Sequence, residues 1–171
     1  MQKEKREEKK MKKIYLAGGL FNAGERLHNL NLEKYLIELG YEVKLPQREA
    51  LKAFNGKNFD VKAIVKSCRE SSSDPEYVFV GNADGADSDS GTCVEYAFSI
   101  ASTGRAVIYR TDFRTALDRE LGINAMLTGE GTEFVYEPCF FTELEQVEPY
   151  YKGLAKKIHE AINKLSSDRK A

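Results

Sequence analysis

The sequence predicts an α/β protein: a single domain with a parallel sheet of about five strands and helices on both faces. Short apolar runs that are typical of buried strands alternate along the chain with segments whose apolar residues recur at helical spacing. Short loops join these segments, which favours parallel strands connected by covering helices. A chain of 171 residues fits one domain with a full hydrophobic core.

Five apolar runs are predicted to be strands. They cover residues 13–17, 41–45, 77–81, 106–109 and 132–136. The first ends at Gly18-Gly19, and we expect Pro46 to halt the second. Because parallel sheets bind ligands at the carboxyl ends of their strands, the polar or glycine-rich segments that follow the strands are expected to converge on one crevice.

Four helices are predicted around these strands. They cover residues 27–39, 59–69, a segment around 94–101, and 154–165. Gly40 is expected to end the first helix. The second helix is expected to end before a polar loop at residues 70–75. In the third helix, apolar residues follow the i, i+3, i+4, i+7 pattern and are expected to face the core; they are Val94, Ala97, Phe98 and Ala101.

The composition is that of an ordinary globular protein. Hydrophobic residues make up 42% of the chain and charged residues 31%. The 26 Lys and Arg residues nearly balance the 27 Asp and Glu residues, so no net field would attract a nucleic acid polymer or an anionic membrane. The three cysteines lack C-x-x-C spacing, which indicates neither a disulfide framework nor a zinc site. We expect no metal and no cofactor.

The ends of the chain are predicted to lie outside the domain. Residues 1–11 are mostly charged and read as a flexible tail, with Met11 as an alternative natural start. The domain is expected to cover residues 12–166, and residues 167–171 to form a polar tail. Because no apolar run reaches membrane-spanning length and no signal-peptide pattern begins the chain, a cytoplasmic location is expected.

Residues 84–95, with the sequence DGADSDSGTCVE, are the segment most indicative of chemistry. Asp89 or Ser90 can cap the helix that follows, and Gly91 opens it with free backbone N–H groups. With Val94 facing the core, Glu95 is expected to project beside the buried face near the helix start. The helix N-terminus is then expected to favour the ionised form of Glu95, which suits a nucleophile.

The segment has three other interpretations. An Asp-rich turn is often no more than a capped, solvated loop. A calcium loop that starts at Asp84 is rejected, because it would place Ala86 and Ser88 where ligands are needed and would lack the required glycine. A phosphate cradle at residues 88–92 is the serious rival, although the aspartates around it would repel a phosphate.

The chain resembles the nucleoside 2-deoxyribosyltransferase family from about residue 12 to residue 127. The matching pieces are KIYLAGGLF at the start, LPQ at 45–47, DSDSGTCVE at 87–95, VIYRTDFR at 107–114 and NAML at 124–127. Each is weak alone, but five in order with compatible spacing form a strong signal. The resemblance implies a flavodoxin-like (Rossmann-like) fold. It also implies a double displacement in which Glu95 attacks C1′ of a 2′-deoxynucleoside, expels the base and forms a covalent deoxyribosyl-enzyme.

The resemblance also implies roles for other residues. Tyr15 matches a tyrosine that orients the nucleophile, although an aromatic packed in a strand is an equally good interpretation. Asp89 matches an aspartate on the 5′-hydroxyl side of the sugar, and Gln47 matches a residue near the nucleobase. The remaining implied substrate-binding residues are Gly18, Gly91, Asn124 and Met126. The last two match a segment that completes the neighbouring subunit's site, which implies a homo-oligomer.

The base side departs from the family pattern. The family has an aspartate eighteen residues before the nucleophile, where this chain has Tyr77. A further family aspartate, which protonates the departing base, would align with Arg69, and an arginine cannot act as a general acid at neutral pH. The acid is therefore unassigned, and the candidates are Asp60, Glu70 and Asp74.

Several functions remain open. Transfer of deoxyribose between bases, with hydrolysis as a side reaction, is the leading hypothesis. Hydrolysis of deoxynucleoside 5′-monophosphates is the alternative, which Asp89 disfavours because it would repel a phosphate. A nucleotide-sensing module without catalysis is the third.

Residues outside the matching pieces receive no firm role. His28 and His159 are interpreted as surface histidines, and Cys93 as a packed small residue. The charged residues Arg110, Asp112 and Arg114 either shape the pocket mouth or form a surface cluster.

Overall fold

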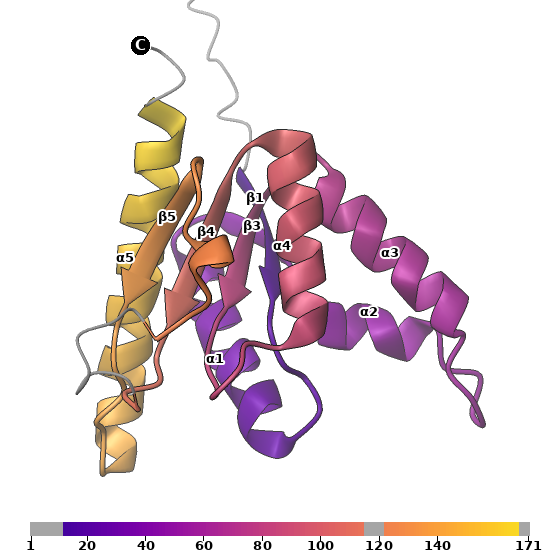
Figure 1. Ribbon diagram of the computed structural model, residues 1–171. Coiled ribbons are helices and arrows are strands. Elements are labelled where there is room, and N and C mark those ends of the chain that lie inside the picture. Colours follow the sequence, from indigo (N-terminus) through magenta and orange to yellow (C-terminus); the bar gives the residue numbers. More distant parts are fainter. Residues whose placement is uncertain (1–11, 115–121, 168–171) are drawn as a thin grey trace, which may run out of the picture.

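The structure is a computed structural model that describes residues 12–114 and 122–167. It contains a five-stranded sheet with the order β2-β1-β3-β4-β5, in which every neighbouring pair is parallel (Figure 1). The strands are β1 (Lys12–Ala17), β2 (Tyr41–Lys44), β3 (Tyr77–Asn82), β4 (Ala106–Arg110) and β5 (Thr132–Tyr136). This order is that of a flavodoxin-like α/β fold, which confirms the predicted fold class.

Five α-helices and two short 3₁₀ helices accompany the strands in the described residues. They are α1 (Ala23–Glu38), α2 (Pro46–Lys52), α3 (Val61–Ser73), α4 (Ser90–Thr103), α5 (Val147–Ser167), η1 (Ala125–Leu127) and η2 (Leu144–Gln146). The predicted tails, apart from Ser167 at the end of α5, lie outside the described residues. In the described part of the chain, no helix has both the length and the apolar character needed to cross a membrane.

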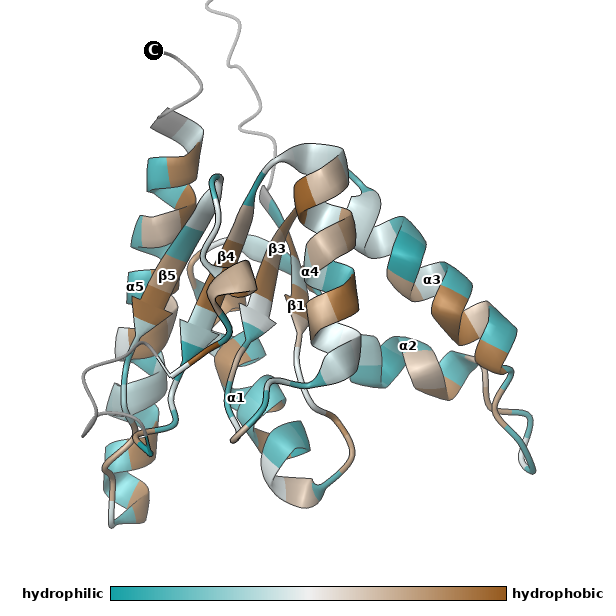
Figure 2. Cartoon of the chain, viewed as in Figure 1, coloured by the Kyte–Doolittle hydropathy of each residue, from teal (hydrophilic) through white to brown (hydrophobic). Residues whose placement is uncertain are grey.

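The sheet has a hydrophobic core on each face. On one face, α1 and α5 pack against alternate strand residues such as Ile14, Val80 and Val107. On the other, α4 lies over the sheet, with α3 beside it, against residues such as Tyr15 and Phe79. The central strands are therefore predominantly apolar, as expected of strands that are buried on both faces (Figure 2).

Local sequence signals set the helix ends. Asn22 caps α1 in a capping box with Glu25, and Gly40, at φ +87°, provides the turn into β2. Asp89 caps α4 by accepting a hydrogen bond from the backbone N–H of Thr92. Gly104 ends α4 in the left-handed conformation, with φ +65°. The start of α4, and with it the position of Glu95, is thus defined by sequence.

The structure differs from the sequence prediction at two points in the middle of the chain. Pro46 follows the end of β2, as predicted, but it also occupies the first turn of α2, a helix that the sequence did not predict, where its missing N–H costs nothing. The loop expected at residues 70–75 is largely the last turn of α3. Ser71 and Ser72 turn their hydroxyls back onto the carbonyls of Ser67 and Cys68, so polar side chains become compatible with a buried helical turn.

The predicted buried face of α4 was also wrong. Val94 is 54% exposed, whereas Thr92, Tyr96 and Ser99 are buried. The hydroxyl of Tyr96 bonds to that of Thr132 at 2.7 Å, and Ser99 donates to the carbonyl of Arg105. Polar groups satisfied in this way can be buried at little cost, and a pattern based on apolar residues alone misses them.

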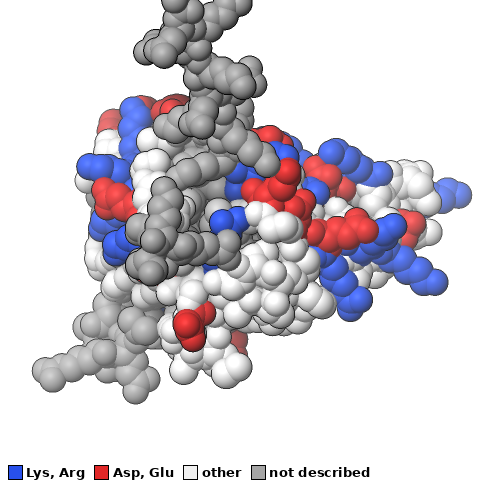
Figure 3. Space-filling model, turned by 90° about the horizontal axis from the view of Figure 1, so that it is seen from above, with Lys and Arg blue, Asp and Glu red and all other residues white. Residues whose placement is uncertain are grey.

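The amino-terminal end of the sheet carries both signs of charge. Figure 3 looks onto this end, where Lys and Arg side chains alternate with Asp and Glu over the part that projects to the right. Lys13, near the start of β1, and Glu76, just before β3, form an ion pair at this end. The visible part of this end therefore offers no extended surface of one sign to a polyanion.

Candidate active site

A cavity of about 520 Å³ lies at the carboxyl end of β1, between α2, α3 and the start of α4. We call it the Glu95 cavity. Apolar side chains from the β1–α1 loop, α2 and α3 make up much of its lining: Leu20, Phe21, Pro46, Ala50, Ala53, Phe59, Ala63 and Ile64. The polar groups that line it include Arg26, Glu49, Cys68, Asp89 and Glu95. An apolar cavity with a few converging polar groups is the usual form of a small-molecule site.

Glu95 is held by a tyrosine from the neighbouring strand. The Tyr15 hydroxyl donates a hydrogen bond to Glu95 Oε1 at 2.9 Å, and Tyr15 itself is only 1% exposed. The thiol of Cys68, on α3, also hydrogen-bonds to the Glu95 carboxylate. The structure therefore brings together the two residues that the sequence singled out for catalysis, and it adds Cys68, which the sequence did not indicate.

Burial controls the electrostatics of this group. Burial raises the pKa of Glu95, the hydrogen bonds from Cys68 and Tyr15 lower it, the charge of Asp89 raises it, and the net shift is upward. The sequence had suggested that the helix N-terminus would favour the ionised form, whereas the net shift of the Glu95 pKa is toward the protonated form. Burial likewise raises the pKa of Cys68 to about 11 and that of Tyr15 well above its usual value. At neutral pH both groups keep their protons and can donate hydrogen bonds to Glu95.

Asp89 and two glycines shape the cavity next to Glu95. Asp89 Oδ2 accepts bonds from the N–H and the hydroxyl of Thr92, at 2.8 and 3.0 Å. A Cβ added at Gly91 would lie 3.1 Å from that same oxygen, and one at Gly18 would lie 3.1 Å from the Cβ of Asn82. Both glycines line the cavity, so the backbone approaches it closely at positions where a larger residue would crowd its neighbours.

Gln47, Asn124 and Met126 lie away from the Glu95 cavity lining. Gln47 is buried behind it, where its Oε1 accepts from Asn29 at 3.1 Å and its Nε2 donates to the Arg26 carbonyl. Asn124 caps η1 through the N–H of Met126, and Met126 is 80% exposed. Neither residue of η1 lines this chain's own cavity.

The acids proposed from sequence for the base side do not line the cavity. Asp60 caps α3, Glu70 pairs with Lys66 on the surface, and Asp74 follows the end of α3. Arg69 also points elsewhere and stacks over the ring of Phe98 at 5.4 Å. Its neighbour Cys68 faces the cavity in its place.

Glu49 is the acid that the sequence reasoning missed. It lies in the first turn of α2 and lines the Glu95 cavity. Its Oε1 accepts a hydrogen bond from Lys52 Nζ at 2.7 Å. The signal that could have found it is the Pro46 position, because a proline at a helix start would have placed the following glutamate on a helix beside β1.

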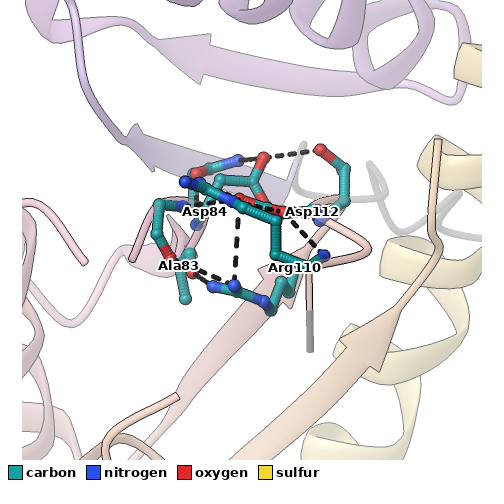
Figure 4. A network of polar contacts seen from close by, with 8 residues as sticks. Ala83, Asp84, Arg110 and Asp112 are labelled. Carbon is teal, nitrogen blue, oxygen red and sulfur yellow. Dashed lines mark hydrogen bonds and ion pairs between the residues drawn. The ribbon is translucent and has the colours of Figure 1, made fainter. Parts of the chain in front are cut away.

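A second cavity of about 670 Å³ adjoins the first and shares Asp89 with it. We call it the Asp84 cavity. Asp84 accepts hydrogen bonds from the backbone N–H groups of Thr111 and Asp112, at 2.6 and 2.8 Å, and from the side chains of Asn82 and Thr111 (Figure 4). It thereby joins the loops that follow β3 and β4.

Arg110 belongs to the same network. It is 1% exposed and donates to the carbonyls of Ala83 and Gly85. Arg110 lies neither at a pocket mouth nor in a surface cluster, because it is buried beneath the loop that follows β3. Asp112 and Arg114 do line the Asp84 cavity, where they form an ion pair.

The two histidines are not free on the surface. His28 bonds to the hydroxyls of Tyr109 and Tyr151, both at 3.0 Å, and burial lowers its pKa. His159 is half-buried and bonds to the Tyr41 hydroxyl at 2.8 Å. The interpretation as surface histidines was therefore wrong, because partners distant in sequence cover both rings. Cys93 is half-buried beside the start of α4.

No group of three or more metal-binding side chains is arranged to hold an ion within residues 12–114 and 122–167. The polar groups that line the Glu95 cavity are carboxylates, hydroxyls, the thiol of Cys68 and the guanidinium of Arg26.

Comparison with known proteins connects this geometry to one family. Residues 14–131 match the nucleoside 2-deoxyribosyltransferase family. A solved structure of a conserved protein from Enterococcus faecalis has a TM-score of 0.58 and 22% identity, over 84% of this chain and 98% of that one. A 2-deoxyribosyltransferase from the psychrotolerant bacterium Bacillus psychrosaccharolyticus has a TM-score of 0.53 and 23% identity, over 80% and 90%. No curated protein matches the chain.

Proposed function

The chain belongs to the nucleoside 2-deoxyribosyltransferase family, and we propose that it transfers 2-deoxyribose between nucleobases through a covalent intermediate on Glu95. The observation that carries this proposal is the pair formed by Glu95 and Tyr15 in an apolar cavity at the start of α4. A buried carboxylate with fixed orientation is the group that attack on an anomeric carbon requires.

The reaction proceeds in two displacements at C1′. In the first, a Glu95 oxygen forms a bond to C1′ while the C1′–N bond breaks and its electron pair leaves with the base. In the second, a nitrogen of another base attacks C1′ from the opposite side, and the bond to Glu95 breaks. Two inversions return the β configuration. Water in place of the second base gives slow hydrolysis.

Tyr15 and Cys68 position the nucleophile. Tyr15 fixes Oε1, which leaves the other carboxylate oxygen for the attack. Each hydrogen bond to the carboxylate also makes it a weaker nucleophile. The two donors therefore lower the reactivity of Glu95 while they fix its orientation. Burial acts in the opposite direction, because it raises the energy of the charged form.

The sugar binds toward Asp89, with the backbones of Gly18 and Gly91 on either side. Asp89 offers a carboxylate to the 5′-hydroxyl, and the Asp84 cavity continues beyond it. Gln47 acts from behind the cavity by fixing Asn29 and the Arg26 carbonyl. We further propose that the exposed Asn124 and Met126 complete the site of a neighbouring subunit in a homo-oligomer.

Free nucleosides are preferred to 5′-monophosphates in this proposal. Among the described residues, five carboxylates line the Asp84 cavity, into which a 5′-substituent would point, against one arginine, Arg114; they are Glu25, Asp84, Asp87, Asp89 and Asp112. A phosphate there would meet net repulsion. Hydrolysis of monophosphates remains the second candidate function, since the small residues Ser88 and Gly91 lie at the same helix start.

The test is base exchange. The protein is incubated with deoxyinosine and free adenine, and the products are separated by chromatography. Formation of deoxyadenosine supports the proposal, and Glu95→Gln is expected to abolish it while Glu148→Gln, a surface glutamate paired with Lys152, leaves it unchanged. Free hypoxanthine without deoxyadenosine would show a hydrolase, and inertness with retained nucleoside binding would show a sensing module. A parallel incubation with deoxyinosine 5′-monophosphate tests the preference at the 5′ position.

A further inference from the structure

We propose that Glu49 exchanges the proton with the nucleobase, as the general acid when a base departs and the general base when a new one arrives. This inference rests on the proposed transferase function. Glu49 lies on α2. The acids that the sequence suggested for this role lie on α3 or at its ends, and none of them lines the Glu95 cavity.

Elimination among the lining residues points to Glu49. Of the described residues, three carboxylates line the cavity: Glu49, Asp89 and Glu95. Glu95 is the proposed nucleophile and cannot also protonate the base in the same step. Asp89 Oδ2 already accepts two hydrogen bonds from Thr92, and Asp89 lines both cavities, a position that fits a hydrogen-bond acceptor for the sugar.

The other polar groups of the cavity are poor acids. The guanidinium of an arginine such as Arg26 does not serve as a general acid. The pKa of Cys68 is raised to about 11, and its hydrogen bond goes to the nucleophile. The hydroxyl of Ser67 is a far weaker acid than a carboxyl group. Glu49 is left as the lining carboxyl group that is neither the proposed nucleophile nor bonded to the backbone at the start of α4.

The surroundings of Glu49 fit a flat heterocycle. Small and aromatic side chains of α2, α3 and the segment between them border it: Ala50, Ala53, Phe59, Ala63 and Ile64. Nucleobases bind well against such apolar surfaces while their edges meet a polar group. The ion pair with Lys52 engages Oε1 and leaves Oε2 for the base edge, and Lys52 is itself exposed and does not line the cavity.

The proton balance closes over one exchange cycle. As the C1′–N bond breaks, the departing base takes the bonding electron pair, and a ring nitrogen takes the proton of the Glu49 carboxyl group. The incoming base brings one ring N–H, and Glu49 recovers a proton from it as the new C1′–N bond forms. The protein returns to its initial protonation state without a proton from solvent, as a reversible exchange requires.

The experiment compares a substrate that needs an acid with one that does not. Deoxyinosine must gain a proton for its base to leave readily, whereas 7-methyl-2′-deoxyguanosine already carries a positive charge on its base and leaves without one. For Glu49→Gln we expect kcat/KM to fall about 100-fold or more with deoxyinosine and to stay within about threefold with 7-methyl-2′-deoxyguanosine. The rate of the wild-type protein with deoxyinosine should also decline toward high pH, and Glu49→Gln should remove that decline.

Control variants separate Glu49 from its neighbours. Lys52→Met removes the same ion pair but leaves the carboxyl group, so it should keep most of the activity with both substrates. Glu95→Gln should lose both. An equal loss with both substrates in Glu49→Gln, or an unchanged decline at high pH, would overturn the inference. If Cys68→Ser rather than Glu49→Gln showed the selective loss, the acid would be Cys68. A wild-type protein inert toward deoxynucleosides would instead refute the proposed function itself.

Discussion

The two adjoining cavities use carboxylates in opposite ways. In the Asp84 cavity, Asp84 accepts four hydrogen bonds, and the pKa of Asp112 is held below its usual range mainly by the guanidinium of Arg114. In the Glu95 cavity, burial dominates, and the pKa of Glu95 is raised. Asp84 and Asp112 therefore hold the loops together, whereas Glu95 is a buried carboxyl group that is protonated more readily than a free one.

The two cavities show how a structural acid differs from a functional one in a segment that contains several acidic residues. Residues 84–95 contain Asp84, Asp87, Asp89 and Glu95 within one loop and one helical turn and a half. Asp84 and Asp89 satisfy backbone N–H groups, which fixes the shape of the loop. Among the described residues, the donors to the Glu95 carboxylate are side chains, those of Tyr15 and Cys68.

The largest expected effect is on activity. Glu95→Gln should lower kcat for base exchange by at least about 10⁴-fold, because loss of a covalent nucleophile removes the reaction path rather than one contact. Its circular dichroism spectrum should match that of the wild-type protein. Exchange within tenfold of wild type would remove Glu95 from the mechanism.

The converse variant is Asp84→Ala, which should damage the fold. Removing this carboxylate leaves the N–H groups of Thr111 and Asp112 without an acceptor, and the expected loss is about 3 kcal/mol in the free energy of unfolding. Urea unfolding monitored by circular dichroism measures it. Wild-type stability in this variant would show that the loops do not depend on Asp84 and would weaken the distinction between the two cavities.

Tyr15→Phe should have an intermediate effect, on activity alone. It removes one hydrogen bond to a charged group, worth about 1.5–3 kcal/mol, so kcat should fall roughly 10- to 100-fold with little change in KM. Steady-state kinetics with deoxyinosine and adenine separate the two parameters. A rise in KM with unchanged kcat would mean that Tyr15 binds substrate rather than orienting Glu95.

The smallest expected effect is on the stability of Glu95→Gln. A carboxyl group whose pKa is raised by folding stabilises the folded state below its unfolded pKa, and that contribution is lost as the pH rises through the folded pKa. At pH 7 the buried charge therefore costs stability, and the uncharged glutamine should raise Tm by roughly 2–4 °C. The gain should shrink as the pH falls through the raised pKa, and a gain that persists at acid pH would have another cause.

Much of the fold was predictable because it depends on short-range signals. All five strands were located within a residue or two, and Gly40, Asp89 and Gly104 end or begin helices for ordinary conformational reasons. The buried side of α4 was not predictable, because it consists of hydroxyl-bearing residues whose partners lie on other elements. The spacing of apolar residues gives no indication of a polar side chain that is buried because residues of other elements form hydrogen bonds with it.

The candidate site, like the fold, was predictable only in part. The resemblance to the family indicated Glu95, Tyr15 and Asp89, and the structure places Tyr15 and Asp89 next to Glu95 at the carboxyl end of β1. Cys68 and Glu49 were missed, since their relation to Glu95 depends on how α2 and α3 pack beside β1. His28 was misjudged for the same reason: Tyr109 and Tyr151, which bond to it, are more than 80 residues away.

The most direct test of the central claim is to isolate the covalent intermediate. The protein is mixed with deoxyinosine without an acceptor base, quenched in acid and digested, and the peptides are examined by mass spectrometry. We predict a deoxyribosyl group on Glu95, absent from Glu95→Gln, together with a β-configured product when adenine is added before the quench. An active wild-type protein that gives an α-configured nucleoside, or that carries the sugar on another residue, would contradict the assignment of Glu95 as the nucleophile.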